Sequence, residues 1–109
     1  MLKRKYRLGN IHLIKPITVE SSLFKIRTSE NGLSINRFSI IVSKRVDRHS
    51  VVRNRIKRKL GASLNEIFDK IKGGRDFLIY PKAAVLEKDK SHITNELLDK
   101  FKKLHLLND

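Results

Sequence analysis

The feature of this sequence that most constrains its fold is a change in the spacing of its apolar residues near position 50. Before that point, in residues 23–28 and 36–43, apolar and polar residues alternate, which is the period of a half-buried strand. After it, from Val51 to Lys72, apolar residues recur every three or four positions, which is the period of an amphipathic helix. A chain that carries both periods is expected to pack helices against a sheet.

Two of the predicted strands precede the change of period. The first covers Leu23–Thr28 and the second covers Asn36–Ser43. The residues from Glu30 to Gly32 between them are typical of a turn. We therefore expect the two strands to pair as an antiparallel hairpin with a longish loop.

Elements are also expected on either side of these segments. Asp76–Tyr80 is a mostly apolar run typical of an interior strand, and Pro81 is expected to end it. A second helix is expected at His92–Leu106, where apolar residues form one stripe. Residues 2–20 lack a clear pattern. Pro16 excludes an uninterrupted helix there, which leaves a short helix or turn around Asn10–Lys15.

The long helix carries its own start and stop signals. Ser50 is the expected N-cap, because a serine hydroxyl can accept a backbone N–H that lacks a helical partner. Gly73 and Gly74 are expected to end the helix. Gly61 lies in its interior and should cost about 1 kcal/mol of stability relative to alanine.

The expected element order is strand–strand–helix–strand–helix, which favours an α+β fold, a single small sandwich of one sheet packed with helices. The chain has 109 residues, no internal repeat, and only 5 Gly and 2 Pro, so no linker is evident. We therefore expect residues 1–109 to form one domain. Whether residues 1–10 are ordered without a partner is left open.

The positive charge of the chain is concentrated in its first part. In total, 25 Lys and Arg stand against 11 Asp and Glu, a net charge of +14. Counted along the sequence, residues 1–65 hold 16 basic and 3 acidic residues, whereas residues 66–109 hold 9 and 8. A concentrated charge indicates a surface that meets a polyanion, because an even distribution would only add self-repulsion. Nucleic acid and an anionic membrane are both candidates, beside a basic face with no partner.

Much of this charge lies in the segment that leads into the long helix. If the apolar arc of the helix centres on Leu60 and Ile67, then Arg55 and Arg58 fall on the solvent side. Like charges this close together weaken a helix, so an anionic partner is expected to offset the repulsion. The basic residues of the segment, opposed only by Asp47, are Lys44, Arg45, Arg48, Arg53, Arg55, Lys57, Arg58 and Lys59.

Nucleic acid is the favoured partner of this segment. Arginine offers a planar fork that can hold two phosphate oxygens at once. A helix lying on a membrane would want Trp or Phe on its apolar side at this end, and neither is present there. No zinc spacing or recognition-helix pair supports base-specific reading of DNA. In the sheet, Phe24 and Tyr80 could serve either as core or as a stacking platform for single-stranded nucleotides.

Independent catalysis finds little support in the sequence. The acidic residues of the basic half are only Glu20, Glu30 and Asp47, whereas a two-metal nuclease needs clustered carboxylates. The chain has no cysteine, which excludes disulfides and Cys-ligated zinc and fits a reducing cytoplasm. No apolar run is long enough for a membrane span or a signal core. The four histidines, which show no metal-ligand spacing, are His12, His49, His92 and His105.

Two motifs in the basic segment are specific in their order and spacing. Ser43-Lys44-Arg45-Val46 ends a predicted strand. After four intervening residues, Val51-Val52-Arg53-Asn54-Arg55-Ile56-Lys57-Arg58 opens the helix. This arrangement resembles the signature of the bacterial ribonuclease P protein component, where a Ser-Lys-Lys-like stretch is followed by an Arg-Asn-Arg-x-Lys-Arg run. The resemblance extends more loosely to Tyr6-Arg7-Leu8 and to Asp76–Lys82.

The resemblance implies a fold and a function. The fold would contain a mixed sheet and a left-handed β-α-β crossover, which is an exception to the usual hand. The protein would be the subunit of a ribonucleoprotein endoribonuclease that binds ribonuclease P RNA and removes the 5′ leader of precursor tRNA. The RNA would carry out the hydrolysis with Mg²⁺, and this chain would supply no catalytic side chain and no metal site.

The resemblance also assigns residues to two contact regions. The contacts to the catalytic RNA would come from Lys44, Arg45, Arg53, Asn54, Arg55, Lys57 and Arg58, and Arg48 and Lys59 of the same basic segment are expected to add to them. The contacts to the single-stranded leader would come from Phe24, Ile26, Ile41 and Lys82. The alternative is a ribosomal or ribosome-associated RNA-binding protein without a processing role, which the same basic helix would serve.

Overall fold

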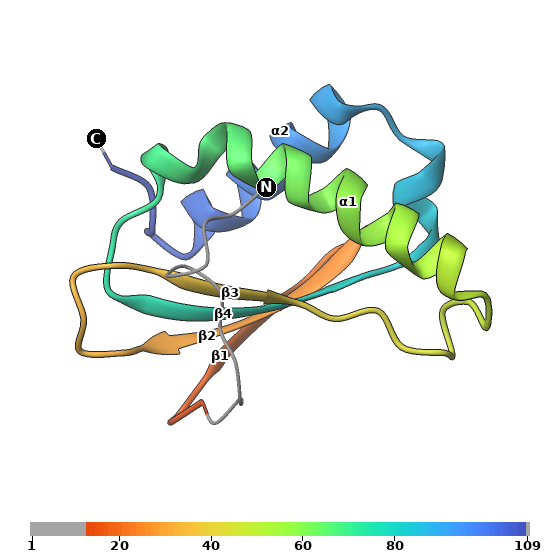
Figure 1. Cartoon of the computed structure of the whole chain (residues 1–109). Helices are drawn as coiled ribbons and strands as arrows, with labels where there is room; N and C mark the ends of the chain where they lie inside the picture. The colour runs from red at the N-terminus through yellow and green to blue at the C-terminus, as the bar shows by residue number, and fades with distance from the viewer. Residues whose placement is uncertain (1–12, 109) are drawn as a thin grey trace.

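The computed structural model describes residues 13–108, which form one four-stranded sheet with two helices packed on it (Figure 1). Three points of the sequence analysis lie outside the described residues. They are the part of the short helix or turn around Asn10–Lys15 that precedes residue 13, the resemblance at Tyr6-Arg7-Leu8, and the order of residues 1–10. In chain order the elements are β1 (Ile17–Glu20), β2 (Phe24–Glu30), β3 (Arg37–Ile40), α1 (Ser50–Ile67), the 3-10 turn η2 (Phe68–Lys70), β4 (Arg75–Pro81), the 3-10 helix η3 (Ala83–Glu87) and α2 (Lys90–Lys103).

The strand order in the sheet is β1-β2-β4-β3. β2 runs antiparallel to β1 and β4, with Ile26 opposite Ile79, and β3 runs parallel to β4, with Phe38 opposite Phe77. Because β3 and β4 are parallel neighbours joined through α1, they form a β-α-β unit. The mixed sheet and the α+β class are thus confirmed, while the left-handed sense of the crossover stays a prediction.

The expected hairpin between the first two predicted strands is wrong. β2 and β3 do not pair, because β4 lies between them. Phe77 and Ile79 point to one face of β4 and Leu78 to the other, and all three are buried. A strand that is apolar on both faces is typical of the interior of a sheet, and β4 takes this position between β2 and β3. The connection at residues 31–36 instead crosses the beginning of β4, and the backbone N–H of Asn31 donates to the Gly74 carbonyl at 2.9 Å.

Both helices cover the same face of the sheet and enclose a single core (Figure 1). At its centre, the rings of Phe38 and Phe77 stack with their centroids 4.8 Å apart, and Phe101 of α2 meets Phe77 edge-on at 5.5 Å. The apolar stripe expected for the first helix is confirmed. Its buried apolar residues are Ile56, Leu60, Leu64 and Ile67.

The ends of α1 differ from the expectation. The N-cap is His49, with no side-chain cap, and Ser50 is already the first helical residue. The helix ends at Ile67, before Gly73 and Gly74. These glycines form the turn into β4, where a Cβ on Gly73 would lie 2.3 Å from the Ser34 carbonyl oxygen and Gly74 has a φ of +96°. Tertiary contact with the loop before β3 therefore explains the glycine pair better than helix capping does.

The remaining boundaries also shift. β1 was not expected, because its short ITVE segment carries little pattern, and it is held by pairing with β2. Pro81 lies within the end of β4 instead of following it. α2 begins at Lys90, where the N-cap Asp89 accepts the His92 backbone N–H at 2.8 Å, and ends at Lys103. Among residues 13–108, no helix has the length and apolar character needed to span a membrane.

Candidate nucleic-acid interface

A basic surface lies where the chain leaves β3 and enters α1. Figure 1 shows this connection at one end of the molecule. A turn begins it, in which the Val46 backbone N–H donates to the Ser43 carbonyl at 3.0 Å. α1 then begins at Ser50 and buries its apolar stripe, so the residues between the stripe positions face solvent. We call the exposed members of this region the basic loop–helix surface: Lys44, Arg45, Arg48, Asn54, Arg55, Lys57 and Arg58.

The positive charge of this surface is not neutralised from within the described part of the chain. None of its six cations has a carboxylate oxygen within 4.0 Å among residues 13–108. On α2, by contrast, Lys100 pairs with Glu96 and Asp99, and Lys103 pairs with Asp99. The predicted outward placement of Arg55 and Arg58 is confirmed. The surface can therefore offer its charge to an external anion.

Arg53 has a different position from its basic neighbours. Its side chain is half-buried, and Nη1 donates to the carbonyl oxygens of Asp47 at 3.0 Å and Arg48 at 2.9 Å. The guanidinium therefore holds the loop in front of α1 in place. Arginine has five N–H donors, so others remain available to a partner. Arg53 thus both supports this loop and borders the exposed cations.

The side chain of Lys59 makes a hydrogen bond within the protein. Its ammonium donates to the Leu86 carbonyl of η3 at 3.0 Å, and the residue is half-buried. This contact joins α1 to the segment that follows β4. We therefore leave Lys59 out of the basic loop–helix surface, although sequence reasoning grouped it with the RNA contacts.

The only acidic residue in the segment also has an internal role. Asp47 Oδ1 accepts the His49 backbone N–H at 2.8 Å and lies 3.0 Å from His49 Nδ1. The backbone hydrogen bond and then the side-chain hydrogen bond from His49 lower the pKa of Asp47. The carboxylate is therefore charged at neutral pH, and its hydrogen bonds go to His49 of its own loop.

The expected leader-contacting positions Phe24 and Ile26 are on the wrong side of the sheet. Both are fully buried in the core beneath the helices. Side chains alternate along a strand, so Lys25 and Arg27 of β2 point to the opposite face. Neither Phe24 nor Ile26 can touch a strand of RNA in this fold.

The face of the sheet away from the helices, which we call the outer sheet face, is formed by Lys25, Arg27, Ile41, Leu78 and Tyr80. The ammonium of Lys25 lies 5.0 Å from the centroid of the Tyr80 ring, close enough for a cation–π contact. Ile41 continues the β3 ladder by donating its N–H to the Ile79 carbonyl at 2.9 Å and is half-exposed. Leu78, between β2 and β3, is buried. The position of Lys25 and Arg27 on this face could have been predicted from the sequence, because they are the polar residues that alternate with Phe24 and Ile26 in β2.

Lys82, the fourth expected leader contact, is engaged at the end of the sheet near β1. Its ammonium lies 2.7 Å from Glu20 Oε2 and donates to the Ser21 carbonyl at 2.8 Å. The hydrogen bond from Lys82, followed by the charge of Lys82, lowers the pKa of Glu20. Lys82 therefore closes the β1–β2 turn against the end of β4.

No metal centre accompanies these surfaces in residues 13–108, where no three His, Asp or Glu side chains come together in a way that could hold an ion. The arrangement is that of a binding surface: a rigid helix presents cations at one end of the molecule, and the outer sheet face carries Lys25 and Arg27.

Comparison with known proteins decides the family. The family model described as Ribonuclease P matches residues 2–105 of the chain. The chain belongs to the ribonuclease P protein family. The ribonuclease P protein component of Alkaliphilus oremlandii is 32% identical over 91 residues, which cover 84% of this chain and 79% of that protein. The component from Bacillus cereus is 36% identical over 67 residues, which are 62% of this chain and 57% of the relative.

Solved structures of ribonuclease P proteins have the same fold. The protein from Thermotoga maritima superposes with a TM-score of 0.72 at 22% identity, covering 82% of this chain and 84% of that one. The Staphylococcus aureus protein gives a TM-score of 0.70 at 24% identity, covering 86% and 85%. The family resemblance inferred from the Arg53–Arg58 motif is thus confirmed, and so is the ribonuclease P protein-like α+β fold.

Proposed function

We propose that this chain is the protein subunit of a bacterial ribonuclease P and works in the cytoplasm. It binds the catalytic RNA through the basic loop–helix surface and helps that RNA remove the 5′ leader from precursor tRNA. The observation that carries the proposal is the set of exposed cations on the rigid start of α1 that have no carboxylate partner in residues 13–108, with Arg55 and Arg58 at its centre.

The physical basis is the release of counterions from RNA. Each phosphate that a Lys or Arg neutralises frees condensed cations, and the logarithm of affinity falls by about 0.7–0.9 for each contact per tenfold rise in salt. A fixed helix face favours such contacts, because α1 is held by its buried stripe before the RNA arrives. Arg55 and Arg58 can each form a bidentate contact with a phosphate.

The role of the protein in this proposal is electrostatic. Hydrolysis of the phosphodiester bond and the Mg²⁺ ions that it needs are assigned to the RNA, and no side chain of this chain is given a catalytic role. Two folded polyanions, the catalytic RNA and the precursor tRNA, repel each other when they meet. Fixed protein cations reduce this repulsion, so less Mg²⁺ is needed for the complex to assemble.

We assign the leader to the outer sheet face instead of the buried Phe24 and Ile26. Lys25 and Arg27 supply positive charge along β2, and the Tyr80 ring beside Lys25 offers a surface on which a base can stack. Ile41 adds an apolar edge from the end of β3. Because stacking and phosphate contacts tolerate many sequences, this surface suits leaders of differing sequence.

The test is reconstitution. The full chain is mixed with a bacterial ribonuclease P RNA, and cleavage of a precursor tRNA is followed at low Mg²⁺ concentration, where the RNA alone is slow. We expect the wild-type protein to restore cleavage at the 5′ end of the mature tRNA. The Arg55→Ala, Arg58→Ala double variant should lose most of this stimulation.

The matched control removes the same charge from α2, by Lys90→Ala with Lys103→Ala, and should stimulate like the wild type. Both control lysines are exposed and far from the start of α1 in sequence and fold. If the wild-type protein gives no stimulation but binds ribosomal RNA tightly, the processing role is wrong and a ribosome-associated role replaces it.

A further inference from the structure

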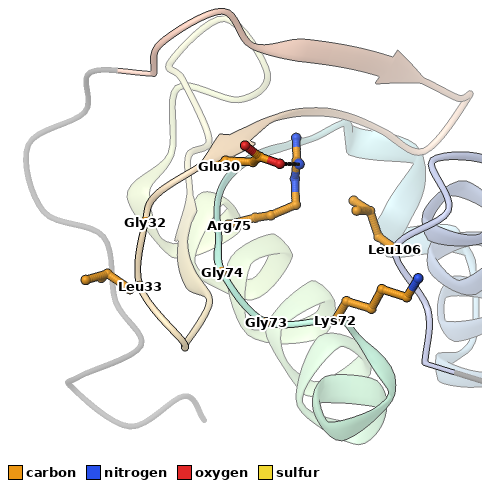
Figure 2. A pocket seen from close by; sticks show the side chains of 8 residues that line it. All are labelled: Glu30, Gly32, Leu33, Lys72, Gly73, Gly74, Arg75 and Leu106. Atoms are coloured by element: carbon orange, nitrogen blue, oxygen red, sulfur yellow. Dashed lines mark ion pairs between the residues drawn. The ribbon is translucent and has the colours of Figure 1, made fainter.

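A second cationic site lies at the other end of α1, in a pocket of about 320 Å³ (Figure 2). Its walls come from the end of β2, the turn between η2 and β4, and the segment after α2. α1 has 18 residues and is therefore ~27 Å long, so this pocket is well separated from the basic loop–helix surface. The residues used below are Glu30, Lys72, Gly73, Gly74, Arg75 and Leu106.

Arg75 is the main charged group of the pocket. It stands on the core side of β4, in register with Glu30, and its side chain is only 13% exposed. Nε donates to Thr28 Oγ1 at 3.1 Å, and Nη1 lies 4.0 Å from Glu30 Oε1, the longest ion pair among the described residues. The remaining guanidinium donors have no partner in residues 13–108 within hydrogen-bond distance. A sheltered cation with free donors favours an anion that can satisfy them.

Lys72 provides a second cation on the opposite wall. Its backbone is fixed on both sides, because its N–H donates to the Leu106 carbonyl at 2.7 Å and its carbonyl accepts Asn36 Nδ2 at 2.8 Å. The side chain is exposed and has no carboxylate within 4.0 Å among the described residues. Figure 2 shows Lys72 and Arg75 on separate walls, with Leu106 between them.

The backbone between these two cations is held in one conformation. Gly73 packs against the Ser34 carbonyl, and Gly74 has a positive φ and accepts the Asn31 N–H. The Arg75 N–H donates to Asn36 Oδ1 at 2.9 Å. The backbone positions of Lys72 and Arg75 are thus set before any ligand binds, which reduces the entropy lost on binding.

We propose that this pocket binds a phosphate group on the Arg75 guanidinium, with the flexible Lys72 side chain of the facing wall as the second cation. Glu30 is the internal competitor: its side chain is 87% exposed, so it can turn into solvent when a phosphate takes its place beside Arg75. The phosphate comes either from an RNA backbone or from free phosphate. Binding of an RNA phosphate in this pocket rests on the proposed function, whereas binding of free phosphate does not.

The first experiment titrates the full chain with inorganic phosphate and follows the backbone amide resonances of residues 72–75 by NMR. We expect saturable shifts in the wild type. Lys72→Gln, at an exposed position that the fold does not depend on, should weaken binding about fivefold through the loss of one charge. Glu30→Gln should strengthen binding, because it removes the competing carboxylate, and a merely structural Arg75 does not predict this gain. Lys88→Gln, outside the pocket, is the control and should bind as the wild type does.

Unchanged amide shifts at 72–75, or equal binding by the Lys72→Gln, Glu30→Gln and wild-type proteins, would overturn the proposal.

The second experiment measures the salt dependence of affinity for ribonuclease P RNA. If the phosphate belongs to RNA, Lys72→Gln should lower the slope by about one contact. If Lys72→Gln leaves the slope for RNA unchanged while the wild-type protein binds inorganic phosphate, the ligand of the pocket is free phosphate. If the proposed function itself is wrong, a different result shows it: the wild-type protein will not stimulate cleavage of precursor tRNA in the reconstitution experiment.

Discussion

Arg37 holds the carboxylate of Asp76 with two parallel hydrogen bonds of 2.8 Å, from Nε to Oδ1 and from Nη2 to Oδ2. The two residues are partners in the parallel register of β3 and β4. Asn31 Nδ2 donates to the same Oδ1 at 2.9 Å and to the Ile35 carbonyl at 3.1 Å. This contact fastens the connection between β2 and β3 to the central strand, and so supports the strand order that displaces the expected hairpin.

The Arg37–Asp76 pair should make stability depend on pH. Burial raises the pKa of Asp76, but the hydrogen bonds from Arg37 and Asn31 and the charge of Arg37 outweigh it, and the pKa is lowered. The stabilisation is therefore complete above the unfolded pKa of about 3.9 and is lost as pH falls through the lower folded value. Urea unfolding at several pH values should show the difference between wild type and Asp76→Asn shrinking below about pH 4. A difference that stays constant down to pH 2 would contradict this assignment.

Removing the arginine at neutral pH should also be costly. Arg37→Ala leaves the Asp76 carboxylate, whose side chain is 9% exposed, without its main partner. We expect the free energy of unfolding to fall by about 2–3 kcal/mol, because hydrogen bonds to a charged group are lost. Arg27→Ala on the outer sheet face, which has no ion pair among the described residues, is the control and should change stability by less than about 0.5 kcal/mol.

Two glycines should respond to alanine in opposite directions. A Cβ on Gly61 in α1 would lie 3.6 Å from Ile40 Cδ1, an ordinary contact, so Gly61→Ala should stabilise the protein by about 0.5–1 kcal/mol through helix propensity. A Cβ on Gly73 would meet the Ser34 carbonyl oxygen at 2.3 Å, so Gly73→Ala should destabilise it. Thermal unfolding of both variants tests this, and a change of the same sign in both would show that the turn adapts.

Substitutions at two adjacent residues of β2 should affect different properties: Phe24 should affect stability, and Lys25 should affect leader binding. Phe24→Ala should cost about 3–5 kcal/mol of unfolding free energy, because it empties a fully buried site in the core. Lys25→Ala should leave stability nearly unchanged and weaken binding of precursor tRNA with a leader to the reconstituted holoenzyme. Binding of mature tRNA without a leader provides the reference. Equal weakening for both tRNAs would remove Lys25 from the leader surface.

Arg53 and Lys57 should differ in how their loss changes the salt dependence of RNA binding. Lys57 is an exposed cation without an ion pair in the described residues, so Lys57→Ala should lower the slope by about 0.7–0.9. Arg53 also holds the carbonyls of Asp47 and Arg48. Arg53→Ala should therefore lower the slope by more than one contact, because the loop cations lose their fixed positions. Equal slope changes in the two variants would show that Arg53 acts only through its own charge.

The secondary structure and the basic helix were predictable because their signals are local. The three- and four-residue spacing around Leu60 and Leu64 specifies which side of α1 is buried, so Arg55 and Arg58 could be placed on the solvent side. β1 was missed because a four-residue strand has too short a pattern, and its stability comes from β2. The internal partners of Lys59 and Lys82 come from η3 and from the β1–β2 turn, which no local signal associates with them.

By itself, the sequence determined the types of every helix and strand after β1 that it predicted, the concentration of charge before residue 65, and the motif that identifies the family. Only the tertiary structure decided that β4 lies between β2 and β3 and that Phe24 and Ile26 face the helices. The physical reason is that alternation along β2 marks Phe24 and Ile26 as the apolar set to be covered, without saying which elements cover them. The covering elements and the strand neighbours are distant in sequence, and their pairing is settled by burying the whole core at once.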